Sequence, residues 1–403
     1  MVYYPGTMSL ITAISARLRG LGHWLSEHEF VIVLIILAVT LGMHFATLTQ
    51  PGILIGDESH YVKDARSILH GYGMQRPEHP SLAKVFIVWG IRMFGDNPWG
   101  WRLFPILFST LSILLFFLIC RRFISLKYAA LMAVFLFAFE NMSFVQGSVA
   151  MLDVYSVTFM LLAFWLYLRG NYAPSAIALA ASAVAKLGGA FAAIAIGLHW
   201  LMTRRGQRLG LLKMLLITPA AFLALMPLTD YAVLGEWLNP ISRLKYMLGT
   251  LSSLTFAHYA SEVASRPWEW VIRPLVYFPY CYGPPYMSML TVTFWALIIP
   301  SMLYMFWPAI KGSNWARFSL CWFAGTYLSY IPMNLITDRI TYVFYFYPTV
   351  PAVAMAIAFG LAQLLELGQV PELGRVRWIP RIVVSSYLVA HLVILGVIGP
   401  VFY

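Results

Sequence analysis

Runs of roughly 15 to 22 apolar residues recur from one end of this 403-residue chain to the other. Each run approaches the length that an α-helix needs to cross the hydrocarbon core of a bilayer. Hydrophobic residues make up 61% of the chain, its mean hydropathy is +0.76, and only 11% of its residues are charged. A water-soluble domain with this sequence would expose too much apolar surface. The pattern therefore predicts an all-α, polytopic membrane protein.

We expect about eleven membrane-spanning helices, and we treat residues 1–403 as one integral membrane domain. The predicted spans are 30–49, 103–120, 127–144, 149–168, 172–186, 189–203, 211–229, 288–307, 316–334, 341–362 and 380–400. The spans from residue 288 onward form a predicted C-terminal bundle, 288–403. Residues 1–29 have apolar and basic residues at helical spacing, which predicts an amphipathic segment on the cytoplasmic membrane surface. The long apolar run from Phe30 and the absence of a small-residue cleavage site argue against a signal peptide.

Charge divides unevenly between the two sets of loops. With the N-terminus inside, the cytoplasmic loops hold 15 of the 27 basic residues and 4 of the 16 acidic ones. The remaining basic and acidic residues balance, so the whole formal charge of +11 lies on the cytoplasmic side. This asymmetry follows the positive-inside pattern. Anionic lipid of the cytoplasmic leaflet would attract the basic loops. The basic composition is thereby explained by orientation, and no nucleic-acid partner is predicted.

Two segments are too long to be simple connections between spans. Residues 50–102 and 230–287 are predicted to be external, and both are only half polar. Apolar residues at helical spacing within 65–69 and 82–89 predict two amphipathic helices along the outer surface in the first loop. We therefore expect the first external loop, 50–102, to form a groove at the outer membrane boundary and to carry the catalytic residues.

Charged residues gather in the first loop between Asp57 and Lys84. A carboxylate in a low-dielectric cleft can act as a general base if its neighbours keep its pKa near the working pH. Asp57 and the adjacent Glu58 are the candidates. The alternative for Asp57 is a helix N-cap, because a helix beginning near Ser59 would leave unpaired backbone amides.

Cations on the same side suit a phosphate group. The first loop contains Lys63, Arg66, Arg76, Lys84, Arg92 and Arg102. Isolated charged residues also lie at the outer ends of later spans: Glu140, Asp153, Lys186 and Arg339. Charges in such positions are costly and are often functional. The alternatives are basic side chains that reach the lipid head groups, and internal ion pairs that orient the helices.

Other kinds of site lack support in the sequence. His60, His70 and His79 share a loop, but their spacing matches no compact metal motif. There is no Gly-rich phosphate loop and no Gly-x-Ser-x-Gly elbow. Of the three cysteines only Cys281 is predicted to be external, so no disulfide framework is expected.

Four segments resemble motifs of the dolichyl-phosphate-mannose protein O-mannosyltransferases, which have the GT-C fold of lipid-phosphate-sugar-dependent glycosyltransferases. Residues 57–63, DESHYVK, resemble Asp-Glu-x-His-Phe-x-Lys, and residues 78–84, EHPSLAK, resemble His-Pro-Pro-Leu-Gly-Lys. His258 and residues 266–270, RPWEW, resemble His-Pro-Trp-x-Trp. Residues 339–348, RITYVFYFYP, resemble Arg-x-x-Phe-Leu-Tyr-His-Tyr-x-Pro. Their order and their shared external side make the resemblance specific over nearly the whole chain.

The resemblance implies an inverting transfer of a sugar, expected to be mannose, from a polyprenyl-phosphate donor to a hydroxyl group of a protein Ser or Thr. Asp57 matches the family's essential acid and would be the base. The implied ligands of the donor phosphate are Arg102, Arg339, Lys84 and Lys186, and the residues near the acceptor or sugar are Glu58, His60, His79 and Asp153. No metal is required by this chemistry, although some GT-C relatives bind a divalent cation through an external-loop Asp, here Asp57 with Asp153.

The sequence also departs from the family pattern. Ser81 and Ala83 replace the second proline and the glycine of the second motif, and an arginine is missing before Leu152. The second external loop is too short for the soluble domain of eukaryotic members. These differences indicate a compact prokaryotic relative in the plasma membrane, with its active site outside, and they leave the substrate open.

Two other functions remain as alternatives at this point. A GT-C transferase could modify a lipid or polysaccharide instead of a protein. A transporter or flippase for a lipid-linked sugar would place its charges at the membrane midplane and often shows inverted repeats. Here the charges lie on one face and no repeat is evident, so transfer is favoured.

Overall fold

The computed structural model describes residues 28–403 with the exception of 124–125, 127, 205, 259–260 and 369–377. The amphipathic segment predicted for 1–29 thus lies outside the described residues, except for its last two. The described chain is almost entirely helical, with one two-stranded antiparallel sheet that the sequence did not predict.

The bounds of the elements are as follows. The first half contains α2 Glu29–Thr47, α3 Glu58–Leu69, α4 Leu82–Phe94, α5 Pro98–Cys120, α6 Ala129–Ala138, α7 Asn141–Ser148, α8 Asp153–Leu168, α9 Tyr172–Ala185, η1 Leu187–Phe191, α10 Ala192–Thr203 and α11 Arg208–Leu234. The second half contains α12 Pro240–Ser253, α13 Glu269–Ile272, β1 Tyr277–Cys281, β2 Tyr286–Met289, α14 Val292–Trp295, α15 Ile298–Ile310, α16 Asn314–Phe323, η2 Ala324–Leu328, α17 Tyr330–Thr337, η3 Val343–Thr349, α18 Val350–Leu367, α19 Ile379–Ile398 and η5 Pro400–Phe402.

Within the described residues, five helices are individually long and apolar enough to cross a membrane. They are α2, α5, α11, α19 and the continuous Val343–Leu367 helix made by η3 and α18. The pair α6 and α7 makes a sixth if counted as one span bent by 54°. The shorter apolar helices are α8, α9, α15 and the helix made by η1 and α10. The chain is therefore a multi-pass integral membrane protein, while the number eleven stays a prediction.

The eighth predicted span, 288–307, is wrong at its beginning. Residues up to Met289 belong to strand β2, the short helix α14 follows at Val292–Trp295, and the apolar helix α15 begins only at Ile298. The strand was missed because its residues continue the apolar run of the helix, and composition alone does not separate a short buried strand from a helix end.

The bend between α6 and α7 is centred on Glu140. Its carboxylate accepts hydrogen bonds from the backbone N and the hydroxyl of Thr291, the former at 2.8 Å. Nε2 of His391 on α19 lies 3.9 Å from the same carboxylate. These contacts join the break in the helix to the end of the hairpin and to the C-terminal helix. They support the structural alternative for Glu140.

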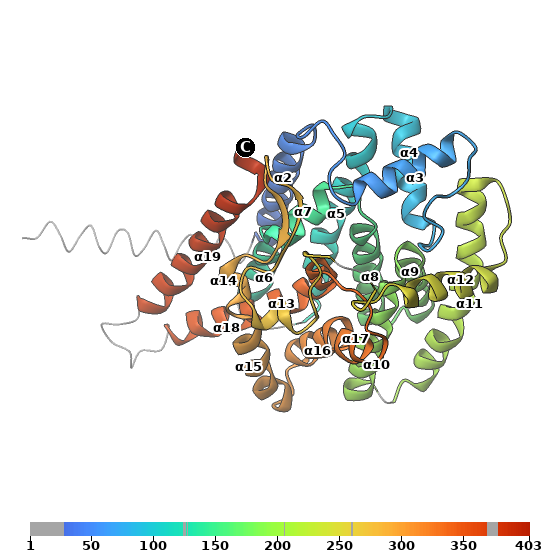
Figure 1. The fold of residues 1–403 in the computed structure, drawn as a ribbon. Helices are drawn as coiled ribbons and strands as arrows, with labels where there is room; N and C mark the ends of the chain where they lie inside the picture. Colours follow the sequence, from blue (N-terminus) through green and yellow to red (C-terminus); the bar gives the residue numbers. More distant parts are fainter. Residues whose placement is uncertain (1–27, 124–125, 127, 205, 259–260, 369–377) are drawn as a thin grey trace, which may run out of the picture.

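The two amphipathic helices expected in the first loop are present as α3 and α4, which lie together at one end of the bundle (Figure 1). Their apolar faces are buried: Tyr61, Val62, Ala65 and Ile68 on α3, and Ala83, Val85, Ile87, Val88 and Ile91 on α4. Helix α4 approaches α5 very closely at Gly90, where an added Cβ would lie 2.1 Å from the carbonyl oxygen of Gly100. Glycine is required there because no larger side chain fits between the two backbones.

The core lies where α5, α8, α16 and α18 meet. Phe116, Phe164, Phe318 and Trp322 are fully buried in it. The ring centroids of Phe164 and Trp322 are 4.8 Å apart, and Nε1 of Trp322 donates a hydrogen bond of 2.8 Å to the carbonyl oxygen of Pro348. This bond fixes η3, the segment that carries Tyr345, against the bundle.

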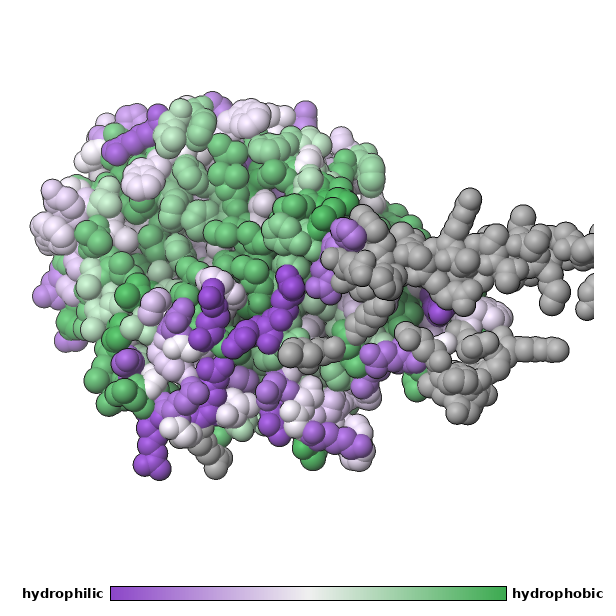
Figure 2. Space-filling view, turned by 180° about the vertical axis from the view of Figure 1, so that it is seen from behind, coloured by the Kyte–Doolittle hydropathy of each residue, from purple (hydrophilic) through white to green (hydrophobic). Residues whose placement is uncertain are grey.

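Large apolar side chains are exposed along the outer helices. Exposed examples include Leu34 and Ile35 on α2, Leu215 and Leu216 on α11, Leu303 and Phe306 on α15, and Val393 and Val397 on α19. Viewed from behind, hydrophobic residues form one broad area, with hydrophilic residues gathered mainly below it (Figure 2). Such a surface is costly in water and suits contact with lipid.

Candidate active site

Asp57 occupies the N-cap position of α3, but its side chain makes no capping hydrogen bond. The capping alternative is therefore not what the geometry supports. Among the described residues the carboxylate has no ion pair or hydrogen bond within ordinary range. Burial raises its pKa to about 6, with Asp153 adding to the shift and Lys186 and Arg76 opposing it. An unpaired carboxylate with this pKa is suited to accept a proton near neutral pH.

Glu58 and Arg102 form a closed, fully buried ion pair. Nε and Nη2 of Arg102 donate to the two carboxylate oxygens at 2.9 and 2.8 Å. The remaining guanidinium hydrogens go to the carbonyl oxygens of Leu48, Pro51 and Ile53 at 2.9 to 3.0 Å. The carboxylate of Glu58 also accepts from the backbone N of Ile55 at 3.1 Å and of Ala150 at 2.9 Å.

No donor of Arg102 is left for a substrate phosphate. An Arg guanidinium has five N–H groups, and the pair with Glu58 and the three carbonyls use all of them. The geometry therefore does not favour the roles that the sequence suggested for Arg102 at the donor phosphate and for Glu58 in the chemistry. The pair instead ties α3 and α5 to the loop after α2 and to the N-terminal side of α8.

Lys84 is likewise occupied. Its ammonium nitrogen lies 2.8 Å from Oδ2 of Asp64, and both side chains are buried. Oδ1 of Asp64 accepts hydrogen bonds from the backbone N of Gln75 and of Arg76 at 2.5 and 3.1 Å. Burial lowers the pKa of Lys84, and Asp64 opposes that change. Lys84 therefore shapes the loop between α3 and α4, which is a different role from the phosphate contact expected of it.

Asp153 and Lys186 meet as an ion pair, although 33 residues separate them. Nζ of Lys186 lies 2.7 and 2.8 Å from the two carboxylate oxygens. The same ammonium lies over the rings of Tyr345 and Phe344, 4.6 and 5.2 Å from their centroids. Lys186 keeps 16% of its side chain exposed, against 3% for Asp153. These two residues thus form the internal ion pair that was the structural alternative. The pair also lies close enough to Asp57 to shift the pKa of its carboxyl group.

His79 lies beside Tyr61, with their ring centroids 5.6 Å apart in an edge-to-face arrangement. Burial lowers its pKa well below the ordinary value, and the cations Lys84, Lys186, Arg339 and Arg76 lower it further. His79 is therefore a neutral imidazole that can exchange a hydrogen bond with a sugar or hydroxyl group without adding charge.

His60 points to the outside of the same loop. It is exposed, and its Nδ1 lies 2.7 Å from Nη2 of Arg76. Arg76 also lies 3.6 Å from the carboxylate of Glu78. The electrostatic effect of Arg76 reaches both Asp57 and His79, so this arginine belongs to the site, whereas His60 lies at its rim.

Arg339 is presented by an irregular segment between α17 and η3. Its Nη1 donates to the carbonyl oxygen of Leu251, and its backbone pairs with Thr255. The neighbouring Asp338 is held by Nη2 of Arg266 at 2.8 Å. Among the described residues no carboxylate forms an ion pair with Arg339. It is therefore a half-buried cation with donors to spare.

The chain is similar to known mannosyltransferases. The model of the family "dolichyl-phosphate-mannose-protein mannosyltransferase" matches residues 34–234, a range that contains Asp57, Asp153 and Lys186. The polyprenol-phosphate-mannose–protein mannosyltransferase of Corynebacterium glutamicum is 22% identical, over 94% of this chain and 90% of that protein. The protein of the same name from Mycolicibacterium smegmatis is 31% identical over a shorter region, 33% of this chain and 27% of that protein. The chain is a relative of the protein mannosyltransferases.

Solved structures show the fold that this mannosyltransferase relative shares. The S. cerevisiae protein O-mannosyltransferase Pmt1-Pmt2 complex bound to the sugar donor aligns with a TM-score of 0.76, at 12% identity, over 93% of this chain and 90% of that chain. ArnT from Cupriavidus metallidurans bound to undecaprenyl phosphate aligns with a TM-score of 0.58, at 19% identity, over 91% and 71%. The chain thus has the GT-C fold that these structures share, as the sequence motifs predicted.

The departure of this mannosyltransferase relative from the family pattern at Ser81 has a structural partner. Oγ of Ser81 donates a hydrogen bond of 2.5 Å to Oδ1 of Asp230, which is fully buried at the end of α11. Arg243 on α12 lies 3.3 Å from Oδ2 of Asp230 and donates to the carbonyl oxygen of Pro77 at 2.6 Å. Ser81 thereby connects the loop that carries His79 to the second long loop.

Three site residues were not assigned by sequence reasoning. In the sequence, Arg76 was noted only as one of six cations in the first loop. Tyr345 was included only as part of the 339–348 motif, without a role of its own. Tyr280 carried no signal at all, because it lies on the hairpin that the sequence did not predict. Its ring packs on Gly56, directly before Asp57.

The carboxylate of Asp57 has no metal site assembled around it among the described residues. Within the described part of the chain, no group of three or more His, Cys, Asp or Glu side chains is placed to hold a metal ion. Asp57 and Asp153 supply only two carboxylates, and both oxygens of Asp153 are engaged by Lys186. Asp57 and Asp153 alone therefore do not form a ligand set for a divalent cation.

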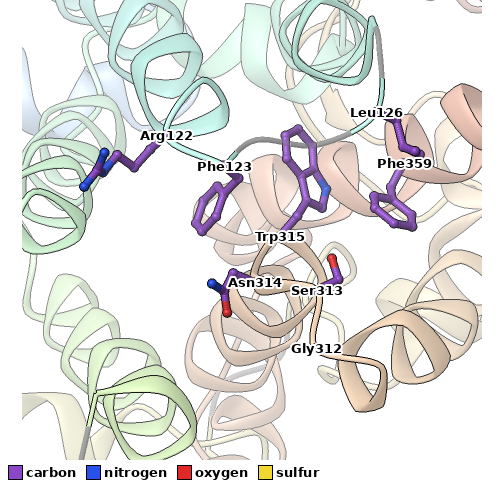
Figure 3. Close-up of a pocket in the computed structure, with 8 residues that line it drawn as sticks. All are labelled: Arg122, Phe123, Leu126, Gly312, Ser313, Asn314, Trp315 and Phe359. Carbon is purple, nitrogen blue, oxygen red and sulfur yellow. The ribbon is translucent and has the colours of Figure 1, made fainter. Parts of the chain in front are cut away.

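A cavity of about 470 Å³ lies far from this site. It is lined by Arg122, Phe123, Leu126, Gly312, Ser313, Asn314, Trp315 and Phe359 (Figure 3). Arg122 lies two residues past the end of α5, whereas Arg102 lies near its start. The 23 residues of α5 make it about 34 Å long. The cavity is therefore separated from Asp57 by the thickness of the helix bundle.

Proposed function

We propose that the protein transfers a sugar, most simply mannose, from a polyprenyl-phosphate donor to a hydroxyl group of a protein Ser or Thr. The observation that carries this proposal is the unpaired carboxylate of Asp57, with a pKa raised to about 6, beside the cations Lys186 and Arg76. The relatives named as polyprenol-phosphate-mannose–protein mannosyltransferases support both the donor and the acceptor.

The mechanism is a single displacement with inversion at the anomeric carbon. Asp57 accepts the proton of the acceptor hydroxyl as its oxygen forms a bond to that carbon. The bond between the anomeric carbon and the phosphate oxygen breaks, and the electron pair leaves with the polyprenyl phosphate. The proton ends on Asp57, and the negative charge gained by the phosphate is met by the cations of the site.

We assign the donor phosphate to Arg339, Lys186 and Arg76. Lys84 and Arg102 are excluded from our assignment because Asp64 and Glu58 already hold them. Lys186 retains a donor direction because Asp153 uses only part of its ammonium group. A phosphodiester carries one negative charge before transfer and gains another as it leaves, so a small excess of cations suffices.

His79 and Asp153 are assigned to the sugar and acceptor side. The neutral imidazole of His79 can bind a hydroxyl group, and Asp153 is positioned near Asp57 by its ion pair with Lys186. His60 would contact an acceptor only at the rim of the site. We derive no step through a metal ion, because the carboxylates present do not form a ligand set.

We further propose that the site faces the outside of the plasma membrane of a prokaryote and that the N-terminus is cytoplasmic. The charge asymmetry supports this orientation. Segments 50–102 and 230–287 would then be the two external loops around the site. A lipid or polysaccharide acceptor remains the second candidate, because a shared fold does not determine the acceptor.

The test is sugar transfer by the purified protein in proteoliposomes. Polyprenyl-phosphate mannose is supplied with a Ser/Thr-containing peptide in one arm and with a lipid acceptor in the other, and the products are identified by mass spectrometry. We expect a mannosylated peptide and inverted anomeric configuration. Transfer to the lipid alone would replace the protein acceptor, and movement of intact donor across the bilayer without transfer would support the transporter.

Replacing Arg339 with Ala should weaken donor binding. A charge-assisted hydrogen bond contributes about 1.5–3 kcal/mol, so the KM for the donor should rise about 10- to 100-fold. Arg273→Ala is the matched control, because Arg273 is 68% exposed and pairs with Glu269 on its own short helix. An unchanged KM in Arg339→Ala would leave this arginine with a purely structural role.

A further inference from the structure

The β1–β2 hairpin lies directly against the turn that carries Asp57. An added Cβ at Gly56 would lie 2.1 Å from Cδ1 of Tyr280 and 3.0 Å from Cε1 and Cγ. The ring of Tyr280 therefore rests on the backbone of Gly56. Gly56 has φ of +48°, in the left-handed region that favours glycine. Both the ring and the backbone conformation exclude a side chain at this position.

Tyr280 is itself fixed by the helix on its other side. Its hydroxyl oxygen accepts a hydrogen bond of 2.7 Å from Nε2 of Gln146, which is fully buried on α7. The same Nε2 donates to Oγ of Ser288 on the second strand at 3.2 Å. The ring of Tyr280 also packs on Phe278, with their centroids 5.1 Å apart.

The second strand is anchored independently of Tyr280. Nδ2 of Asn141 donates to the carbonyl oxygens of Met287 and Met289 at 2.8 and 3.1 Å. The hydroxyl of Tyr286 donates to the carbonyl oxygen of Thr47 at 3.1 Å. The hairpin is thus bound to α7 and to the end of α2, so it forms a rigid support for the ring of Tyr280.

We infer that Tyr280 is a positioning residue for Asp57, and that Gln146 and the hairpin hold its ring on Gly56 so that the carboxylate faces the donor. This inference rests on the proposed function for its catalytic consequence. The ring also keeps water from one side of the turn, which contributes to the desolvation of Asp57. The other titratable groups that act on or near Asp57 are Lys186, Asp153, Arg76 and Tyr61.

The first test measures the turn itself and needs no sugar transfer. Hydrogen–deuterium exchange is followed for the peptide that covers residues 55–61, whose amides close the turn before α3. Tyr280→Ala should speed this exchange about tenfold or more, because the support is removed. Tyr282→Ala is the control, since Tyr282 lies in the same hairpin but is 69% exposed. Equal exchange in the Tyr280→Ala and wild-type proteins would overturn the inference.

The second test separates the ring from the hydroxyl in the transfer assay. Tyr280→Ala should lower kcat about 10- to 100-fold through displacement of the base, with less than about a threefold change in donor KM. The acidic limb of its pH profile should also move to lower pH, as water reaches Asp57. Tyr280→Phe keeps the ring and should retain most of the activity. Loss of donor affinity without loss of kcat would assign Tyr280 to substrate binding instead.

A double-substitution cycle gives the sharpest evidence for direct contact. Gly56→Ala should be inactive alone, because its Cβ meets the ring of Tyr280, and Tyr280→Ala should relieve part of that clash. Additive effects in the double variant would contradict the contact. If the wild-type protein transfers no sugar, the proposed function fails, while the exchange result still decides the positioning role.

Discussion

Replacing Asp57 with Asn should reduce the rate of sugar transfer about 10²- to 10⁴-fold, the usual contribution of a general base. The protein should stay folded, because the carboxylate of Asp57 makes no capping bond and no ion pair that the substitution could break. The initial rate of transfer is measured in proteoliposomes with saturating donor and peptide. The affinity for the donor is measured separately. Binding should persist, because the cations assigned to the phosphate are all retained.

The pH dependence of the wild-type protein belongs to the same prediction. Burial raises the pKa of Asp57 to about 6, and a base works only when ionised. The rate should therefore fall as pH is lowered through about 6, and this limb should be absent from the residual rate of Asp57→Asn. Asp96→Asn is a suitable control, because Asp96 is a 43% exposed carboxylate in the same loop. Near wild-type turnover in Asp57→Asn would require another base.

Replacing Arg102 with Ala should destabilise the protein by about 3–5 kcal/mol, because it leaves the buried carboxylate of Glu58 without its cation. The carbonyl oxygens of Leu48, Pro51 and Ile53 would lose their partners as well. Thermal unfolding of the detergent-solubilised protein, followed by size-exclusion chromatography, measures the loss. Arg102→Lys should be intermediate, since an ammonium cannot reproduce the bidentate contact and the carbonyl bonds together.

The control for Arg102 is Arg66→Ala. Arg66 also forms a two-point contact with a carboxylate, that of Asp96, but its side chain is 35% exposed. Exposed pairs contribute at most about 1 kcal/mol. A stable Arg102→Ala protein with a raised donor KM would return Arg102 to the donor phosphate, the role that its place in the first loop suggested.

Sequence reasoning was most successful for features that follow from the hydropathy and charge of the individual residues. The hydropathy pattern predicted the class of protein, and the helical spacing in the first loop predicted α3 and α4. The charged residues on one face also pointed to Asp57, Asp153 and Lys186, which the structure brings together. Their roles stay a prediction. The charges drew attention because burial in a membrane makes each charge costly, so a charged residue there is informative.

Sequence reasoning was least successful where a charge could have two partners. Glu58, Arg102 and Lys84 lie in the same motifs as Asp57 and look equally available in the sequence. The structure closes Arg102 on Glu58 and Lys84 on Asp64. For this reason our proposed phosphate contacts are Arg76, Lys186 and Arg339 instead. Pairing depends on distances of a few ångströms between segments that the sequence order does not relate.

The sequence by itself determined that this chain is a multi-pass helical membrane protein, because hydropathy is a property of each residue. Only the tertiary structure decided which charges remain free for a substrate. It placed Asp57 without a partner and set Tyr280 from a distant hairpin against the turn before it. The reason is that availability is set by the neighbours that folding supplies, and those neighbours come from other parts of the chain.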